Sequence, residues 1–98
     1  MAADAVQVAP DVYKILFEND RVRLLETRLQ PGATSTMHHH ADNLVYNLAD
    51  AEVAFTDESG ETTRVSLAAG ETMWSPAVDH STRNTGSTEV RSLLFELK

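Results

Sequence analysis

Apolar and polar side chains alternate along much of this chain in short runs separated by turn-forming residues. The clearest pair of runs lies at residues 51–57 and 62–67, on either side of a Glu-Ser-Gly turn. Because strand side chains point alternately to opposite faces, Val53, Phe55 and Val65 mark one apolar face, and the pattern predicts a β-hairpin. No sustained helical period is present in the sequence.

The same pattern predicts further strands elsewhere in the chain. They are expected at residues 12–17, 21–30, 43–48, 73–74 and 89–97. Within residues 21–30 the apolar positions change phase, which predicts a β-bulge near Leu24 and Leu25. Strands that recur every 8 to 12 residues or so, with glycine-containing turns, are typical of an all-β sandwich or barrel.

Length and composition limit the organisation of the chain. With 98 residues, of which 42% are hydrophobic, the chain is expected to form one domain over residues 1–98. A domain of this size buries roughly 60 to 70% of its unfolded surface, which leaves no room for a second core. Residues 1–10 are interpreted as an N-terminal extension, either an arm or an edge strand.

Charge and cysteine content exclude several functions. Fifteen acidic against eight basic residues give a net charge of -7, which disfavours binding to nucleic acid or to anionic membranes. The absence of cysteine removes disulfides and thiolate metal ligands. Residues 1–10 lack the features of a signal peptide, and no apolar stretch is long enough to cross a membrane, so we expect a cytoplasmic protein.

The histidines carry the strongest chemical signal. Three of the four stand in one run, His38, His39 and His40, and the fourth is His80. In a strand His38 and His40 share one face, while His39 points to the other. A same-face pair plus a third imidazole from a neighbouring strand can hold a divalent ion and leave positions open for substrate. We therefore expect a metal site at His38, His40 and His80, and a surface role for His39.

The two histidine segments resemble the paired motifs of the cupin superfamily. Each segment begins with a glycine, and the first contains a His-x-His pair. The matching positions are Gly32, His38, His40, Gly70, Pro76, His80 and Asn84. The resemblance covers residues 12–97 and implies a cupin double-stranded β-helix, or jelly-roll barrel, with a three-histidine metal site.

The sequence departs from the family pattern at the site itself. Asn43 stands where the metal-binding glutamate of the family is expected, after a shortened loop. Val78 replaces a glycine of the second motif, and His80 follows Pro76 one residue early. Asp42 or the Asn43 carbonyl is expected to supply an oxygen ligand if the loop bends inward. The identity of the ion stays open among Fe, Mn, Zn, Ni and Cu.

Strand parity suggests which other residues line a pocket. If Asn43 points into the barrel, then Val45 and Asn47 do so too, while Leu44, Tyr46 and Leu48 point outward and need cover. We therefore expect a homodimer or cover by the N-terminal segment.

Four further residues are pocket candidates. Met73 and Trp74 are read as core or pocket wall. Arg91 is either an inward residue, as an anchor for a substrate carboxylate or an ion-pair partner for Glu26, or a solvated surface residue.

The resemblance implies a metal-dependent enzyme, dioxygenase-like, acting on a small oxygenated metabolite. An isomerase and a hydrolase are further possible activities, and no catalytic acid or base is identified. Two other functions stay open: a non-catalytic cupin that binds a small ligand, and a degenerate structural cupin without metal.

Overall fold

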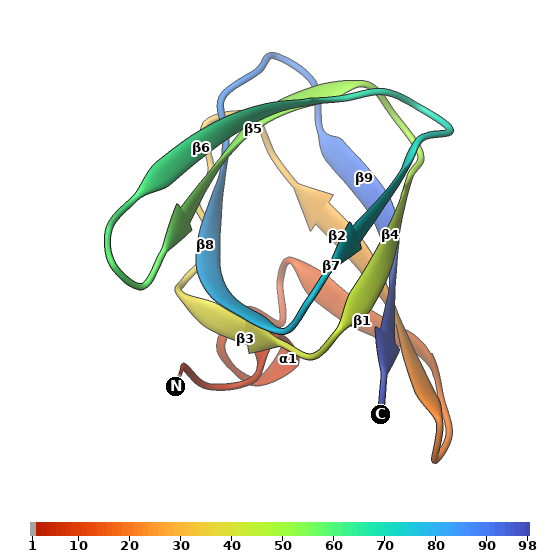
Figure 1. Cartoon of the computed structure of the whole chain (residues 1–98). Coiled ribbons are helices and arrows are strands. Elements are labelled where there is room, and N and C mark those ends of the chain that lie inside the picture. Colours follow the sequence, from red (N-terminus) through yellow and green to blue (C-terminus); the bar gives the residue numbers. More distant parts are fainter. Residues whose placement is uncertain (1) are drawn as a thin grey trace.

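The computed structural model describes residues 2–98, which form nine strands and one short helix. The elements are α1 (Ala5–Val8), β1 (Tyr13–Glu18), β2 (Val22–Leu29), β3 (His38–His40), β4 (Asn43–Asn47), β5 (Ala51–Asp57), β6 (Thr62–Leu67), β7 (Thr72–Ser75), β8 (Val78–Asn84) and β9 (Val90–Leu97). A five-stranded sheet has the order β1-β2-β9-β4-β7, and a four-stranded sheet has the order β3-β8-β5-β6. The sheets face each other and enclose a barrel-like interior (Figure 1). The predicted all-β architecture is confirmed.

The predicted hairpin is formed by β5 and β6, which pair antiparallel from Ala51 with Leu67 to Thr56 with Thr62. Its turn depends on Gly60, whose φ of 91° lies in the left-handed region that other residues rarely adopt. The Asp57 carboxylate accepts hydrogen bonds from the backbone N–H groups of Ser59 and Glu61 and so fixes the turn.

The predicted bulge is present, but it lies in the opposite strand. Ile15 pairs with Leu25 and Phe17 pairs with Leu24, so the extra residue is Leu16 of β1. Strand β2 pairs with β9 without interruption along its whole length. The phase change in the sequence of β2 marks the place of the bulge, while pairing on the other edge of β2 keeps that strand regular.

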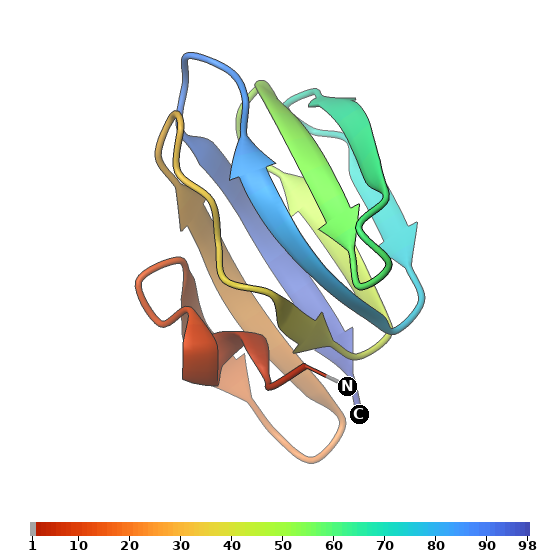
Figure 2. The same cartoon turned by 90° about the vertical axis from the view of Figure 1, so that its left-hand side faces the viewer.

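The N-terminal segment is docked on the barrel through one helical turn and an isolated parallel β-bridge between Asp4 and His39. Asp4 caps the single turn of α1 by accepting a hydrogen bond from the Val6 N–H. The His39 N–H donates to the Ala3 carbonyl at 2.8 Å, which attaches the segment to β3 (Figure 2). Ala5 is fully buried, so α1 closes the end of the barrel where the histidines lie.

Parity on β4 and β9 determines what faces the interior. On β4, Asn43 and Asn47 are buried, whereas Leu44 and Tyr46 are exposed, as predicted. On β9 the buried residues are Val90, Ser92, Leu94 and Glu96. Apolar side chains from both sheets form the core, and its most buried members include Leu25 and Val53. No helix among residues 2–98 is long and apolar enough to span a membrane.

Candidate metal centre

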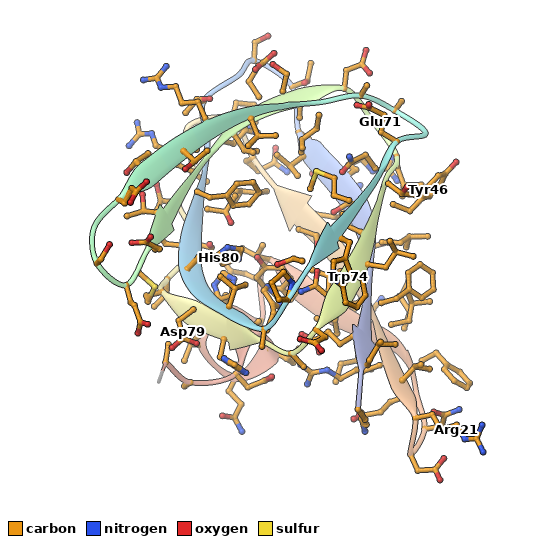
Figure 3. All side chains as sticks on the ribbon, viewed as in Figure 1. Arg21, Tyr46, Glu71, Trp74, Asp79 and His80 are labelled. Carbon is orange, nitrogen blue, oxygen red and sulfur yellow. The ribbon has the colours of Figure 1, made fainter. Side chains whose placement is uncertain are left out.

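Three imidazoles from two neighbouring strands converge at one end of the barrel. Strands β3 and β8 pair antiparallel, with His38 directly opposite His80. One ring nitrogen from each of His38, His40 and His80 lies within 4.8 Å of the others. Figure 3 shows His80 on the barrel side of β8 and Asp79 outside it. The structure therefore brings together the three residues that the sequence selected.

His38 is held in one tautomer by its own backbone neighbourhood. Its Nδ1 donates to the Thr36 carbonyl at 2.6 Å, so Nε2 carries the lone pair. The Tyr13 hydroxyl lies 3.1 Å from this Nε2 and donates to it. Burial lowers the pKa of His38 to about 4, although the bond to Thr36 opposes the shift. His38 is therefore neutral at pH 7, which is the form that binds metals.

His40 has one occupied and one unpaired ring nitrogen. Its Nδ1 donates to Glu96 Oε2 at 2.8 Å, and its Nε2 is buried without any hydrogen-bond partner among residues 2–98. Histidines that bind metals commonly donate their other N–H to a carboxylate, which fixes the ring and makes the ligand nitrogen more basic. An orphaned, buried lone pair beside two further imidazoles fits a metal ion.

A chain of charges stands behind His40. The Arg23 guanidinium donates to Glu96 Oε1 at 2.6 Å and to both carboxylate oxygens of Asp4, at 2.6 and 3.1 Å. Burial alone raises the pKa of Asp4, but the bonds from Arg23 outweigh it and leave the pKa below its usual value. Arg23 thus compensates two carboxylates, and the row Asp4–Arg23–Glu96–His40 fixes the imidazole from behind.

The place of the missing family glutamate is occupied by a buried amide. Asn43 lies on the inner face of β4 and donates from Nδ2 to the Ala41 carbonyl at 2.9 Å. Asp42 is exposed and accepts a hydrogen bond from the Ala77 N–H, so the prediction of Asp42 as a ligand is wrong. The shortened loop turns the Asp42 carboxylate toward Ala77 rather than inward. A ligand role for Asn43 stays a prediction.

The third imidazole is oriented by an aromatic ring. His80 stacks on Phe55, with ring centres 5.2 Å apart and planes inclined by 11°. Burial, together with repulsion from His38 and His40, lowers the pKa of His80 to about 3. Protonation of His38 and His80 is therefore disfavoured, which leaves their ring nitrogens available to a cation.

His39 points away from this cluster, as its parity predicted. Its Nδ1 lies 2.6 Å from Asp79 Oδ1 on the outer face, and Asp79 also accepts a hydrogen bond from the Ala2 N–H. These bonds lower the pKa of Asp79. His39 and Asp79 thus connect the N-terminal segment to the sheet, and neither reaches the metal centre.

Solved structures of the same architecture decide the fold. A cupin domain from Bordetella pertussis Tohama I matches with a TM-score of 0.81, covering 100% of this chain and 97% of that chain at 23% identity. The chain has the cupin fold. A cupin family protein with a double-stranded β-helix fold from Methanocaldococcus jannaschii matches with a TM-score of 0.71 at 17% identity, over 88% of this chain and 78% of that one.

An enzyme is among the further structures that share this cupin fold. The polyketide cyclase RemF from Streptomyces resistomycificus matches with a TM-score of 0.64 at 21% identity, covering 87% of this chain and 63% of that chain. No protein-family model matches the sequence, and no curated protein matches it. At these identities the likeness establishes the fold alone, and function has to be argued from the site.

A cavity of about 290 Å³ opens from the histidines into the interior of this cupin barrel. His40, His80 and Tyr13 border it at the metal centre. Its apolar wall consists of Leu29, Val45, Val53, Phe55, Val65, Leu67, Met73, Trp74, Val90 and Leu94. Its other polar residues are Thr27, Asn43, Ser75, Thr82 and Ser92. The expected pocket role of Met73 agrees with this lining, whereas Trp74 borders the cavity but pairs with the outward-facing Leu44 and is 57% exposed.

Three other pocket candidates lie elsewhere. Arg91 points outward from β9, with its Nε 3.8 Å from Glu89, so it is no inward anchor. Glu26 is on the outer face of β2 and borders a surface hollow instead of the cavity. Of the two alternatives for Arg91 the structure has the surface one, and Glu26 has no pocket role, because their strands present the alternate residues to the interior. Asn47 is buried on the inner face, as predicted, but it does not line the cavity.

Sequence reasoning missed the residues that support the histidines. Tyr13 and Phe55 were read as ordinary strand residues, and Glu96 received no role. Glu96 shares its parity with Val90, Ser92 and Leu94, so a carboxylate on an otherwise apolar or small face was the available signal. Its partner Arg23 is on β2, the strand next to β9, and has the same parity there as the buried Leu25.

Proposed function

We propose that this cupin binds a divalent metal ion through His38, His40 and His80 and uses it in a metal-dependent reaction on a small oxygenated molecule. The observation that carries the proposal is the His40 Nε2 atom, buried and unpaired among residues 2–98 and close to the other two imidazoles. Leaving such an acceptor unsatisfied costs about 1–3 kcal/mol, which a bound cation would offset.

The protein groups around the ligands have separate tasks in this proposal. Thr36 and Glu96 accept hydrogen bonds from the Nδ1–H groups of His38 and His40, so the Nε2 lone pairs are left for the ion, which has to displace the Tyr13 hydroxyl from His38. A bound divalent ion would supply Lewis acidity and open positions for a chelating oxygen substrate. Burial raises the pKa of Tyr13, so its phenol keeps its proton at the edge of the cavity. The apolar wall excludes water from whatever is bound.

A dioxygenase-like reaction is the specific activity that we propose. Three neutral imidazoles leave the charge of a divalent ion uncompensated, which favours an anionic, chelating substrate at the open positions. Imidazole ligands suit Fe, Zn, Ni and Cu, and Mn favours oxygen ligands, so the native ion among these five has to be measured. The enzyme among the structural neighbours, the polyketide cyclase RemF, supports catalysis as a use of this fold.

A non-catalytic ligand-binding cupin is the second candidate. The observation in its favour is the lining of the cavity, in which no Asp, Glu, Lys or Arg takes part among the described residues. The titratable groups that border it are Tyr13, His40 and His80. Under this reading the ion anchors a ligand without turning it over.

Metal analysis of untagged protein from metal-replete cells tests the proposal. We expect about one equivalent of a single divalent metal, lost in His80→Ala and retained in His39→Ala, the matched change on the outward-facing histidine. A folded wild-type protein without metal would contradict it and favour the degenerate cupin. Oxygen uptake with diketones, thiols and hydroxy acids then separates the enzyme from the binding protein.

We further propose that two copies of the chain associate through the outer face of the five-stranded sheet. An apolar row crosses this face in register, from Leu24 through Phe95 and Leu44 to Trp74. Tyr46 stands beside it and points away from the barrel (Figure 3). Leu44 is 40% and Trp74 57% exposed. Because the chain carries a net charge of -7, an uncharged row is where two copies meet with least repulsion.

A further inference from the structure

A pair of hydroxyl groups lies on the wall of the cavity. Thr27 of β2 and Ser92 of β9 are direct partners in the register of the five-stranded sheet, and both line the cavity. Both are more than nine-tenths buried, with exposed fractions of 8% and 5%. The Thr27 Oγ1 atom has no hydrogen-bond partner among residues 2–98.

The neighbours of Thr27 do not serve this hydroxyl. Tyr13 is its partner on β1, but the Tyr13 hydroxyl is engaged with His38 Nε2. On the other side of Ser92, its register partner on β4 is Asn47, whose side-chain amide atoms are also without a partner in the described chain. Buried hydroxyl groups are normally hydrogen-bonded, to protein or to ordered water, so the unpaired Thr27 hydroxyl beside the cavity has a hydrogen bond left to make.

We propose that the cavity takes a small molecule with a compact apolar body and one uncharged hydrogen-bonding group, a hydroxyl or a carbonyl, that pairs with Thr27 and Ser92. We place the opposite end of this molecule toward an ion at His40 and His80, and this placement rests on the function proposed above. The pairing with the two hydroxyls does not depend on it.

Size and lining define the class of ligand. An apolar cavity of about 150 Å³ is known to accept benzene, so about 290 Å³ holds a substituted ring or an aliphatic body of similar bulk. Leu29, Val90 and Leu94 surround the hydroxyl pair with apolar surface. A charged group there would be desolvated without a counter-charge, because no Lys, Arg, Asp or Glu of the described chain lines the cavity. Phosphorylated substrates and those with two separate carboxylates are thereby excluded.

A double comparison of ligand and protein tests the pairing. The probes are phenol and benzene, which differ by one hydroxyl, and their dissociation constants are measured by NMR titration of metal-free protein. Thr27→Val removes the protein hydroxyl at nearly constant shape. The matched control is Thr56→Val, whose hydroxyl bonds Thr62 on the exposed hairpin. Ser92→Ala is the second variant if Thr27→Val does not fold.

We expect the preference for phenol over benzene to fall about three- to tenfold in Thr27→Val and to stay constant in Thr56→Val. An unchanged preference in both cavity variants would overturn the proposal, and so would folded wild-type protein that binds neither probe. Because this measurement is made without metal, its result is independent of metal analysis. A protein that binds phenol through Thr27 but no ion would retain this inference and lose the proposed function.

Discussion

Glu96 lies directly opposite Asn43 in the register of β9 and β4, and both side chains are buried on the inner face of the sheet. The position that resembles the family's glutamate position thus carries an amide, while a carboxylate stands one strand away. From there Glu96 contacts the Nδ1 of His40 and not the side of the ring that faces the cluster. The carboxylate supports a ligand from behind instead of being one.

This arrangement makes Glu96 a determinant of metal affinity. In Glu96→Gln the side chain keeps its size but loses its charge, so His40 becomes a less basic ligand. We expect metal binding to weaken about 10- to 100-fold, as measured by competition with a chelating dye. Glu58→Gln, in the exposed β5–β6 turn, is the matched control and should bind like wild type. Equal affinity in the two variants would rule out the role of Glu96.

Tyr13 has the opposite effect on the same site. Its hydroxyl donates to the Nε2 of His38, the nitrogen left for an ion because Nδ1 is engaged with Thr36. Metal binding at Nε2 has to break this hydrogen bond. We expect Tyr13→Phe to bind metal about three- to tenfold more tightly, by titration at fixed pH, because the competing bond is gone. Weaker binding would mean that the phenol itself contributes to holding the ion.

The low pKa values of two histidines predict how stability depends on pH. His38 and His80 have pKa values of about 4 and about 3 in the folded protein, against 6.5 for an ordinary histidine. Between these values the unfolded chain binds more protons, so lowering the pH favours unfolding. The free energy of unfolding of metal-free protein should therefore have its highest value above pH 6.5 and fall as the pH drops toward 4.

Urea unfolding of metal-free protein at several pH values between 7.5 and 4 measures this effect. The carboxylates with lowered pKa values have ordinary values of 3.8 for Asp4, Asp57 and Asp79 and 4.5 for Glu18, so their contribution is lost mainly below about pH 5, and the range from pH 7.5 to 5 reports on the histidines. His39→Ala should keep the same dependence, because His39 lies outside the cluster. A urea unfolding midpoint that stays constant from pH 7.5 to 5 would contradict the neutral, buried state of the His38 and His80 rings.

Local periodicity was sufficient to predict an all-β fold and the same-face pair His38 and His40, whereas the cupin topology and the third imidazole, His80, were implied by the resemblance to the cupin motifs. Strand alternation placed His38 and His40 on one face and His39 on the other, and it placed Asn43 and Asn47 on one common face of β4. Each of these assignments needs only the neighbouring residues in the chain.

The supporting residues could not be predicted in the same way, because they depend on pairing between distant strands. The contact between His40 of β3 and Glu96 of β9 crosses from one sheet to the other, and the position of Asp4 requires the docking of α1 beside Arg23. Alternation divides β9 into two faces but does not say which is inward, so Arg91 was left open. Burial of Ser92 and Glu96 in the folded chain resolves it.

The exposed apolar row provides a last prediction, on association. In a dimer through this face, Leu44 is central, because it pairs with Phe95 on one side and Trp74 on the other. Leu44→Glu would bury an uncompensated charge, at about 3–5 kcal/mol, and so raise the dimer dissociation constant more than a hundredfold. Sedimentation velocity should show a dimer for wild type and for Ser87→Glu, which adds the same charge in the β8–β9 loop, and a monomer for Leu44→Glu. A wild-type monomer at high protein concentration would eliminate this interface and leave the outer face without a second copy to cover it.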